Sequence, residues 1–302
     1  RALTAAGGTK DDIIQVAYGY GLFTGGLGAH QGATEIGATV IPMSSGNTQR
    51  QIIMMKELGS TMLCCTPSYA TYLAETIREM GIKPEELKLK SGCFGAEPWT
   101  EEMRQHLEDL LDFDALDIYG LTEIGGPGVA FECMEKHGMH INEDHVLAEI
   151  INPATGEQVP YGEEGELVFT TLSKFAMPMI RYRTRDLTRI ISEPCECGRT
   201  IRRIARISRR SDDMFIIRGV NVFPSQIETG LLAVDDSLPH YRIILTRRDD
   251  GLDDMLVEVE INPENFSDKV RAMEDLQHKF VHSVERILGI RTPVKIVPPN
   301  TI

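Results

Sequence analysis

Segments typical of β-strands alternate with segments typical of α-helices through the first 120 residues, and no other feature restricts the fold as strongly. The strand-like runs are short and mostly apolar, and they cover residues 13–17, 39–42, 61–66, 89–94 and 115–119. The segments between them carry helix signals, such as Pro67 at the start of one and Gly81 at its end. Repeated strand–helix units of this kind predict an α/β fold with a mostly parallel sheet and helices on both faces.

The pattern of the sequence changes twice further along the chain. From about residue 141 to residue 211, short strand-like runs and turns predict a β-rich subdomain. From residue 212, a strand, a helix, two strands, a long amphipathic helix and a last strand predict a small α+β domain. We therefore expect a large domain over residues 1–211, partial at its N-terminal end, and a small C-terminal domain over residues 212–302.

The acidic balance of the chain argues against a nucleic-acid partner. The 302 residues include 45 acidic and 31 basic side chains, a formal charge of −14, and such a surface repels a polyanion. No apolar run approaches the roughly 18 to 20 residues that span a bilayer, so we expect no membrane association. The six cysteines are not spaced like a disulfide framework, which favours a reducing cytoplasm.

The most specific segment is 117–123, Asp-Ile-Tyr-Gly-Leu-Thr-Glu, which lies at the end of a strand-like run. Ligands of α/β sheets bind beyond the carboxyl ends of the strands. There Tyr119 can stack on a purine, Thr122 can hydrogen-bond a phosphate, and Glu123 can hold Mg²⁺ through oxygen. The segment predicts a nucleoside triphosphate site; the alternative is a turn in which Thr-Glu merely starts a helix.

Two weaker segments follow. In segment 182–186, Tyr-Arg-Thr-Arg-Asp, Asp186 can accept both hydroxyls of a ribose, although a surface salt-bridge cluster has the same composition. Segment 209–213, Arg-Arg-Ser-Asp-Asp, lies where the pattern of the sequence changes. A short charged segment at such a place is typical of a hinge between domains, with an ordinary solvated linker as the alternative.

The order and spacing of these three segments resemble those of the adenylate-forming superfamily, and the chain is most similar to phenylacetate–coenzyme A ligases. The similarity runs nearly end to end and is carried by residues 18–30, 94–99, 180–188 and 218–224. It implies that ATP, with Mg²⁺, converts an aryl acid such as phenylacetate into an acyl-adenylate with release of pyrophosphate. Coenzyme A then takes the acyl group and AMP leaves. The resemblance also implies a homodimer and a role in aromatic catabolism.

The resemblance assigns roles to individual residues. The residues expected to contact ATP, AMP or coenzyme A are Ala96, Glu97, Asp117, Tyr119, Gly120, Thr122, Asp186, Arg210 and Gly219. Thr122 and Glu123 are expected to be catalytic, the first at the α-phosphate and the second through Mg²⁺. Asp212 would be the pivot of the hinge. Arg209 stands where the family usually has glycine, before the hinge arginine Arg210.

By the same resemblance, the acyl pocket is formed by the glycine-rich segment 18–30. Tyr18 and Phe23 would present flat apolar faces to an aryl ring, and Ala29 would leave room for it. As an alternative, both aromatic residues belong to the core. His30 lies in the same segment and is the one further histidine that the sequence singles out.

Cysteine and histidine residues gather in two segments that together suit a structural zinc site. Cys195 and Cys197 are one residue apart at a turn, and the segment that contains Cys133 and His140 supplies a third thiol and an imidazole. Three thiolates and one imidazole complete a closed tetrahedral zinc site. His137 is the alternative nitrogen ligand, and unliganded thiols are the alternative to any metal.

Two segments expected of such ligases are not recognisable in the sequence. They are the glycine-rich phosphate loop that would precede residue 13 and the segment with the adenylation lysine that would follow the last strand. Lys295 lies within that strand and is not a substitute. The sequence as given is therefore expected to have weak activity or none. Two alternatives stay open: a ligase or adenylating enzyme for another acid, and a non-catalytic nucleotide-binding fragment.

Overall fold

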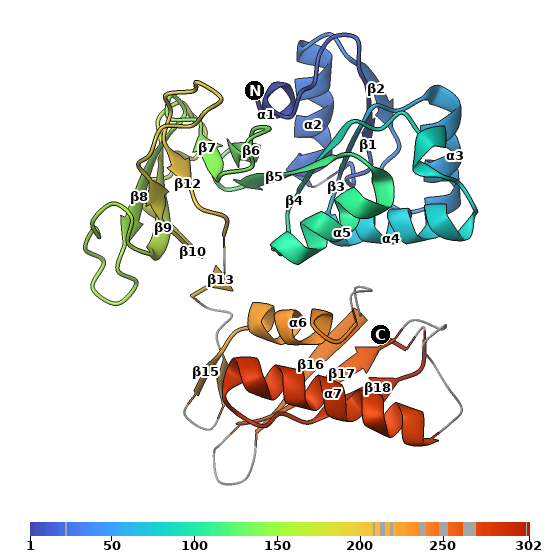
Figure 1. Ribbon diagram of the computed structural model, residues 1–302. Helices are drawn as coiled ribbons and strands as arrows, with labels where there is room; N and C mark the ends of the chain where they lie inside the picture. Colours follow the sequence, from blue (N-terminus) through green and yellow to red (C-terminus); the bar gives the residue numbers. More distant parts are fainter. Residues whose placement is uncertain are drawn as a thin grey trace. The chain divides into compact units, whose positions relative to one another are not determined.

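The structure is a computed structural model that describes residues 1–21, 23–207, 209–211, 215–217, 220–235, 240–247, 253–261, 270–299 and 301–302. These residues divide into two compact units, Arg1–Ser208 and Arg209–Ile302, whose elements are drawn in Figure 1. The second unit begins three residues before Asp212, the start expected from the sequence.

The first unit is built on a nine-stranded sheet with the strand order β11-β12-β7-β6-β5-β4-β3-β1-β2. Its strands are β1 (Ile13–Val16), β2 (Thr39–Pro42), β3 (Met62–Cys65), β4 (Ser91–Gly95), β5 (Asp114–Leu121), β6 (Gly126–Phe131), β7 (Met139–Ile141), β11 (Ile190–Ile191) and β12 (Arg203–Ile204). Strands β1 to β5 pair in parallel, which confirms the expected α/β class. The remaining pairs are antiparallel. Short turns follow β5 and β6, so the chain reverses direction without a crossover helix.

Helices cover the parallel part of this sheet on both faces. They are α1 (Ala2–Ala5), α2 (Thr24–Glu35), α3 (Thr48–Leu58), α4 (Pro67–Glu79) and α5 (Glu101–Leu111), with a 3₁₀ turn at Pro84–Glu86. On β3, Met62 and Cys64 pack in the core shared with α2, while the intervening Leu63 and Cys65 are equally buried. Because successive side chains of a strand point to opposite faces, both faces of β3 are covered.

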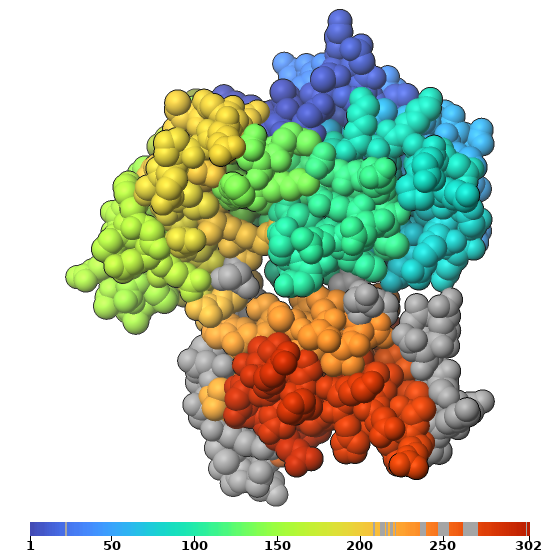
Figure 2. All heavy atoms as spheres, in the orientation of Figure 1, coloured from blue at the N-terminus to red at the C-terminus, as the bar shows by residue number. Residues whose placement is uncertain are grey.

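The β-rich part of the first unit contains a second, antiparallel arrangement of β8 (Val146–Ile151), β9 (Gly165–Thr171) and β10 (Tyr182–Thr188). Its core is shared with β6 and β7, because Phe169 and Leu167 pack in one cluster with Ala130 and Ile141. Figure 2 shows this light green and yellow part beside the blue and cyan strand–helix part, with the green β5–β7 region between them. The antiparallel half of the large sheet thus joins the two parts of the unit.

The second unit has its own core around a three-stranded sheet. Its elements are β13 (Arg209–Arg210), β14 (Phe215–Ile217), β15 (Val220–Val222), α6 (Pro224–Leu232), β16 (His240–Arg247), β17 (Asp253–Glu260), α7 (Val270–Leu288) and β18 (Val294–Val297). Strands β16 and β17 pair antiparallel, and β18 joins β17 in parallel. Helices α6 and α7 pack together, and Phe280 and Val284 of α7 are fully buried. Among the helices that the structure describes, none has the length and apolarity needed to cross a lipid bilayer.

A buried carboxylate ties the starts of three parallel strands together. Asp12 is 3% exposed and directly precedes β1. It accepts hydrogen bonds from the backbone N–H and the hydroxyl of Thr9 at 2.8 and 2.9 Å, from the Thr61 hydroxyl at 2.8 Å, and from the Lys90 ammonium at 2.9 Å. Burial alone would raise the pKa of this carboxyl, but the Lys90 ammonium and the other donors outweigh it and lower the pKa to about 2.

We expect Asp12→Ala to lower the free energy of unfolding at pH 7 by about 2 kcal/mol, because it removes hydrogen bonds to a buried charge. Asp11 is exposed, and Asp11→Ala is the matched control, with an expected change below about 0.5 kcal/mol. Since the folded-state pKa lies below the unfolded-state value, the contribution of Asp12 is complete above about pH 4 and is lost toward pH 2. Denaturant unfolding at pH 7 and pH 3 measures it; equal differences between wild type and Asp12→Ala at both pH values would contradict this account.

Candidate active site

Tyr119 of β5 and Asp186 of β10 are in direct contact, although 67 residues separate them in the sequence. The Tyr119 hydroxyl donates a 2.5 Å hydrogen bond to Oδ2 of Asp186. The Tyr119 ring packs against Phe169 of β9, with 6.3 Å between ring centroids. The fold therefore brings together the aromatic ring and the carboxylate that were predicted to hold a purine and a ribose.

The remainder of the 117–123 segment forms a tight turn between β5 and β6. Residues 122–125 are the turn, so Thr122 and Glu123 do not start a helix, and both are exposed. A Cβ atom on Gly120 would lie 2.0 Å from the carbonyl oxygen of Gly126, which makes glycine necessary for this close approach. The Thr122 hydroxyl lies 3.3 Å from the Thr24 hydroxyl at the start of α2. The turn thus presents a hydroxyl and a carboxylate beside Tyr119.

Ala96 and Glu97 follow the carboxyl end of β4, the parallel neighbour of β5. Ala96 is exposed and has φ +73°. This value lies in the left-handed region, a backbone conformation that is unfavourable for alanine. The Glu97 carboxylate accepts a 2.6 Å hydrogen bond from the backbone N–H of Ser68, in the first turn of α4, where the helix dipole favours a negative charge. Both residues therefore lie at the same sheet edge as Tyr119, where α/β folds bind ligands.

A buried charged cluster lies beneath this edge, and the sequence had not indicated it. Arg104 of α5 forms two 2.8 Å hydrogen bonds to the Glu132 carboxylate, and these side chains are only 1% and 3% exposed. Glu132 also accepts the backbone N–H of Asp117 at 2.7 Å. Burial, and then the charge of Glu132, raise the pKa of the Asp117 carboxyl to about 7. Arg206 stacks on Trp99 at 4.9 Å and lies 3.7 Å from Asp117.

Asp117 is therefore a buried member of this cluster, and its expected contact with a nucleotide stays a prediction. No local pattern in the sequence could have revealed the cluster. Its members come from α5, β5, the residue after β6 and the segment after β12, and only the tertiary fold makes them neighbours.

The glycine-rich segment 18–30 runs from the end of β1 into α2. Tyr18 is buried and donates a 3.4 Å hydrogen bond to the Cys93 carbonyl, while Phe23, 6.0 Å from it between ring centroids, is 40% exposed. Ala29 is buried on α2. A contact that sequence reasoning missed joins the Tyr20 hydroxyl to Nδ1 of His30 at 3.1 Å. Of the predicted acyl-pocket residues, Phe23 thus has the accessible aromatic face and Tyr18 lies behind it.

Cys133, His140, Cys195 and Cys197 converge in the first unit, and their candidate ligand atoms all lie within 4.8 Å of one another. The sulfur atoms of Cys133 and Cys195 are 3.7 Å apart, and the Cys197 sulfur is 3.4 Å from Nε2 of His140. Burial opposes ionisation of the Cys197 thiol, but donors that include the backbone N–H of Arg199 lower its pKa to about 7. His137 is exposed and is not part of this group.

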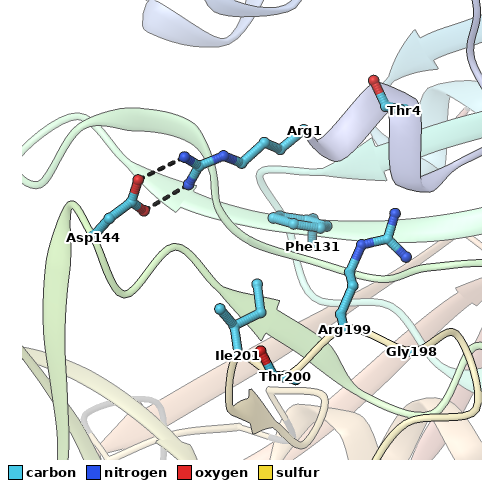
Figure 3. A pocket seen from close by; sticks show the side chains of 8 residues that line it. All are labelled: Arg1, Thr4, Phe131, Asp144, Gly198, Arg199, Thr200 and Ile201. Carbon is cyan, nitrogen blue, oxygen red and sulfur yellow. Dashed lines mark hydrogen bonds and ion pairs between the residues drawn. The ribbon is translucent and has the colours of Figure 1, made fainter.

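A cavity of about 570 Å³ lies beside this cluster and is shown in Figure 3. It is lined by Arg1, Thr4, Phe131, Asp144, Gly198, Arg199, Thr200 and Ile201. An ion pair between Arg1 and Asp144 lies along one side, with both hydrogen bonds 2.6 Å long, and Phe131 and Arg199 also face the cavity. None of the residues predicted to contact nucleotide or aryl acid lines it, so it is distinct from the sheet edge.

Three further residues with predicted roles come from the second unit. Arg210 is a partly exposed residue of β13. Asp212 and Gly219 lie outside the described residues. The expected roles of these residues in nucleotide binding, in the hinge and near coenzyme A stay predictions.

Comparison with known proteins gives a consistent family assignment. The AMP-binding enzyme family matches residues 9–175, and the AMP-binding enzyme C-terminal domain matches residues 219–302. Phenylacetate-coenzyme A ligase of Escherichia coli is 50% identical over 304 residues, covering 100% of this chain and 69% of the relative. The Pseudomonas putida enzyme of the same name is 49% identical over 308 residues, covering 100% and 68%.

Solved structures agree with these sequence relatives. A crystal structure of 2-hydroxyisobutyryl-CoA ligase in the postadenylation state, in complex with R3-HIB-AMP, matches with a TM-score of 0.92 at 30% identity, over 100% of this chain and 65% of that one. The anthranilate CoA ligase AuaEII, in complex with anthranoyl-AMP, matches with a TM-score of 0.69 at 15% identity, over 98% and 58%, which shows similarity of fold alone. The chain spans about two thirds of the length of its curated relatives. It belongs to the AMP-binding enzyme family and, within that family, to the phenylacetate–coenzyme A ligases.

Proposed function

We propose that the full-length protein joins phenylacetate to coenzyme A at the expense of ATP. In the first half-reaction a phenylacetate oxygen attacks the α-phosphorus, giving phenylacetyl-adenylate and pyrophosphate. In the second, the coenzyme A thiol displaces AMP. The names of relatives that are 46–50% identical support the reaction. The observation that carries the proposal is the Tyr119–Asp186 contact at the carboxyl edge of the parallel strands.

In this proposal the sheet edge holds the adenosine part of ATP. Adenine stacks on Tyr119 beside Ala96 and Glu97, and Gly120 lets the chain turn closely there. Asp186 accepts the ribose hydroxyls with its carboxylate oxygens, one of which also accepts the hydrogen bond from Tyr119. That hydrogen bond gains strength from the negative charge of its acceptor and so orients both side chains.

Catalysis of adenylation rests on orientation and charge. The Thr122 hydroxyl donates a hydrogen bond to the α-phosphate, and Glu123 supplies oxygen ligands for Mg²⁺. When bound there, Mg²⁺ would neutralise negative charge on the phosphates. Because the turn is short and its strands are fixed by β5–β6 pairing, these two side chains are preorganised relative to the adenosine site.

The aryl group of the acid is proposed to pack on the exposed face of Phe23. Tyr18 supports Phe23 from the core, and Ala29 leaves space at the first turns of α2. Aromatic pairs of this kind favour a flat apolar substrate over a short or a flexible aliphatic acid.

For the second half-reaction we propose roles that rest on the family resemblance. Arg210 contacts ribose or phosphate, Asp212 is the pivot between two arrangements of the units, and Gly219 approaches the pantetheine arm of coenzyme A. We also propose a homodimer that acts in the cytoplasm, without nucleic-acid or membrane partners.

We further propose that Cys133, His140, Cys195 and Cys197 bind one structural zinc ion. Two sulfurs each about 2.3 Å from a tetrahedral zinc are roughly 3.8 Å apart, and a sulfur and an imidazole nitrogen are roughly 3.6 Å apart. The observed separations of 3.7 and 3.4 Å fit these values, and the sulfurs are too far apart for a disulfide. Four protein ligands leave no open position, so such an ion would stabilise the fold without taking part in the reaction.

Loss of the Asp186 carboxylate should mainly weaken ATP binding. We expect Asp186→Ala in the full-length protein to raise KM for ATP about 10- to 100-fold, since hydrogen bonds to a charged group contribute about 1.5–3 kcal/mol. The KM for ATP is measured from the rate of pyrophosphate release in the presence of phenylacetate at varied ATP concentration. Glu157→Ala, at an exposed turn after β8, is the control and should leave KM unchanged. An unchanged KM in Asp186→Ala would contradict the proposed ribose contact.

Substrate preference should follow from burial of the aryl ring. We expect kcat/KM of the full-length protein to be at least about 100-fold higher for phenylacetate than for acetate, a few kcal/mol of discrimination. Phe23→Ala should reduce the value for phenylacetate by at least about tenfold and change the value for acetate little. A steady-state comparison of both acids decides the point; equal kcat/KM values for the two acids in the wild type would refute it.

Purified protein that has not met a chelator should contain about one equivalent of zinc. Cys197→Ser should reduce zinc to below about 0.2 equivalents and lower the melting temperature, because a closed zinc site contributes folding free energy. Cys65→Ala, a buried cysteine outside the group, is the control and should keep its zinc. Metal analysis by mass spectrometry provides the measurement, and less than a tenth of an equivalent in wild type would rule the site out.

A further inference from the structure

The residues of the first unit that we assign to the nucleotide include acidic side chains but neither lysine nor arginine. The residues assigned to it are Ala96, Glu97, Asp117, Tyr119, Gly120, Thr122, Glu123 and Asp186. The triphosphate of ATP is a polyanion, and the pyrophosphate that leaves gains further charge as its bond to the α-phosphorus breaks. Preorganised positive charge near the leaving group stabilises such a transition state. The charge of these residues is therefore opposite to what the phosphates require.

Lys174 places an ammonium group at this turn. Its Nζ donates a 2.5 Å hydrogen bond to the backbone carbonyl oxygen of Glu123. A lysine ammonium has three N–H donors, and a carbonyl uses one of them. The Lys174 ammonium thus contacts the backbone of Glu123, the residue proposed to hold Mg²⁺. Glu123 directly follows Thr122, the proposed phosphate contact.

The loop that carries Lys174 is fixed on both sides of it. Thr171 and Met179 exchange hydrogen bonds of 2.9 Å across the base of the loop. The backbone N–H of Leu172 donates to the His145 carbonyl at 2.8 Å, and the Ser173 hydroxyl lies 2.8 Å from Nδ1 of His145. Lys174 therefore extends from an anchored segment, which lowers the conformational entropy that it loses when it binds a ligand.

The same loop connects the two strands that form the other side of the site. It leaves β9, whose Phe169 packs on Tyr119, and it enters β10, which carries Asp186. Beyond Lys174 the loop exposes apolar side chains, with Phe175 98% and Ile180 80% accessible. The contact with Glu123 is thus made by a charged residue at the anchored start of an otherwise exposed loop.

We propose that Lys174 is a further phosphate-binding residue of the adenylation reaction, whose ammonium contacts the β- and γ-phosphates of ATP from its position at Glu123. The proposal rests on the proposed function. As the acid oxygen forms its bond to the α-phosphorus, the bond to the bridging oxygen breaks, and pyrophosphate leaves with the electron pair. Lys174 stays protonated throughout and stabilises the charge that gathers on the leaving group.

The test separates ligands that contain the outer phosphates from one that lacks them. In the full-length protein, Lys174→Met should weaken MgATP and pyrophosphate binding about 10- to 100-fold, the size expected for one charge-assisted contact. It should change AMP affinity less than about twofold. Lys174→Arg, which keeps the charge, should restore MgATP affinity to within about threefold of wild type. Titration calorimetry with the three ligands gives these affinities without any turnover.

Separate assays of the two half-reactions provide an independent test of the role of Lys174. Lys174→Met should reduce pyrophosphate release by a similar factor, and should leave thioester formation from supplied phenylacetyl-adenylate and coenzyme A within about twofold of wild type. Lys88→Met is the control, because exposed Lys88 precedes the amino end of β4, at the opposite edge of the sheet. It should behave like wild type in every assay.

Other outcomes overturn the proposal. Equal losses of AMP and MgATP affinity would show that Lys174 only holds the turn in place, and unchanged MgATP affinity would show no role at all. A wild-type protein that binds MgATP but releases pyrophosphate with no acid would refute the proposed function, while the calorimetric comparison would still decide whether Lys174 contacts the outer phosphates. A wild-type protein that binds no MgATP would refute both.

Discussion

The buried ion pair between Arg104 and Glu132 holds the strand on which the candidate site depends. Arg104 reaches from α5 to the Ala115 carbonyl and to both oxygens of Glu132, and Glu132 accepts the backbone N–H of Asp117. Strand β5 is therefore fixed from two sides before it reaches Tyr119. Breaking such a pair by removing one partner typically costs about 3–5 kcal/mol, because the other charge is left buried and uncompensated.

This strand also separates the two kinds of pairing in the large sheet. On one side β4 pairs with it in parallel, and on the other β6 pairs with it antiparallel. A parallel edge provides strand ends at which ligands bind, and the antiparallel turn places Thr122 and Glu123 beside those ends. The β-rich part then supplies Asp186 and Lys174 from β10 and from the loop before it. The candidate site thus combines residues from both parts of the first unit.

Acidic side chains lie both in the cluster around Arg104 and at the candidate site itself. Two buried carboxylates (Asp117, Glu132) and the exposed Glu101 share two guanidinium groups (Arg104, Arg206). Burial, and then the charge of Glu132, raise the pKa of Asp117. The exposed Glu123 and the buried Asp186 add further acidic side chains at the candidate site. The Lys174 ammonium is a positive group held beside Glu123, and in the proposed reaction it faces the phosphates of ATP.

The sequence by itself determined the class of fold, the family and the order of the main elements. These inferences rest on local patterns: strand and helix periodicity, proline and glycine at helix ends, and the segments 117–123 and 182–186. Each pattern can be recognised without knowing which residues it contacts in the fold. They also named Tyr119 and Asp186 as separate candidates, and the two cysteine-containing segments as halves of one site. They did not show that the Tyr119 hydroxyl bonds to the Asp186 carboxylate, or that His140 and not His137 joins the thiols.

Only the tertiary structure decided which of these residues meet and what surrounds them. The cluster of Arg104, Glu132 and Arg206, the burial of Tyr18 behind Phe23, and the contact of Lys174 with Glu123 join positions that are distant in the chain. Judged from the sequence alone, an arginine on a helix or a lysine in a loop is indistinguishable from an ordinary surface charge. Their roles arise from burial and from neighbours across the sheet, and these follow from packing of the whole chain, which no local pattern encodes.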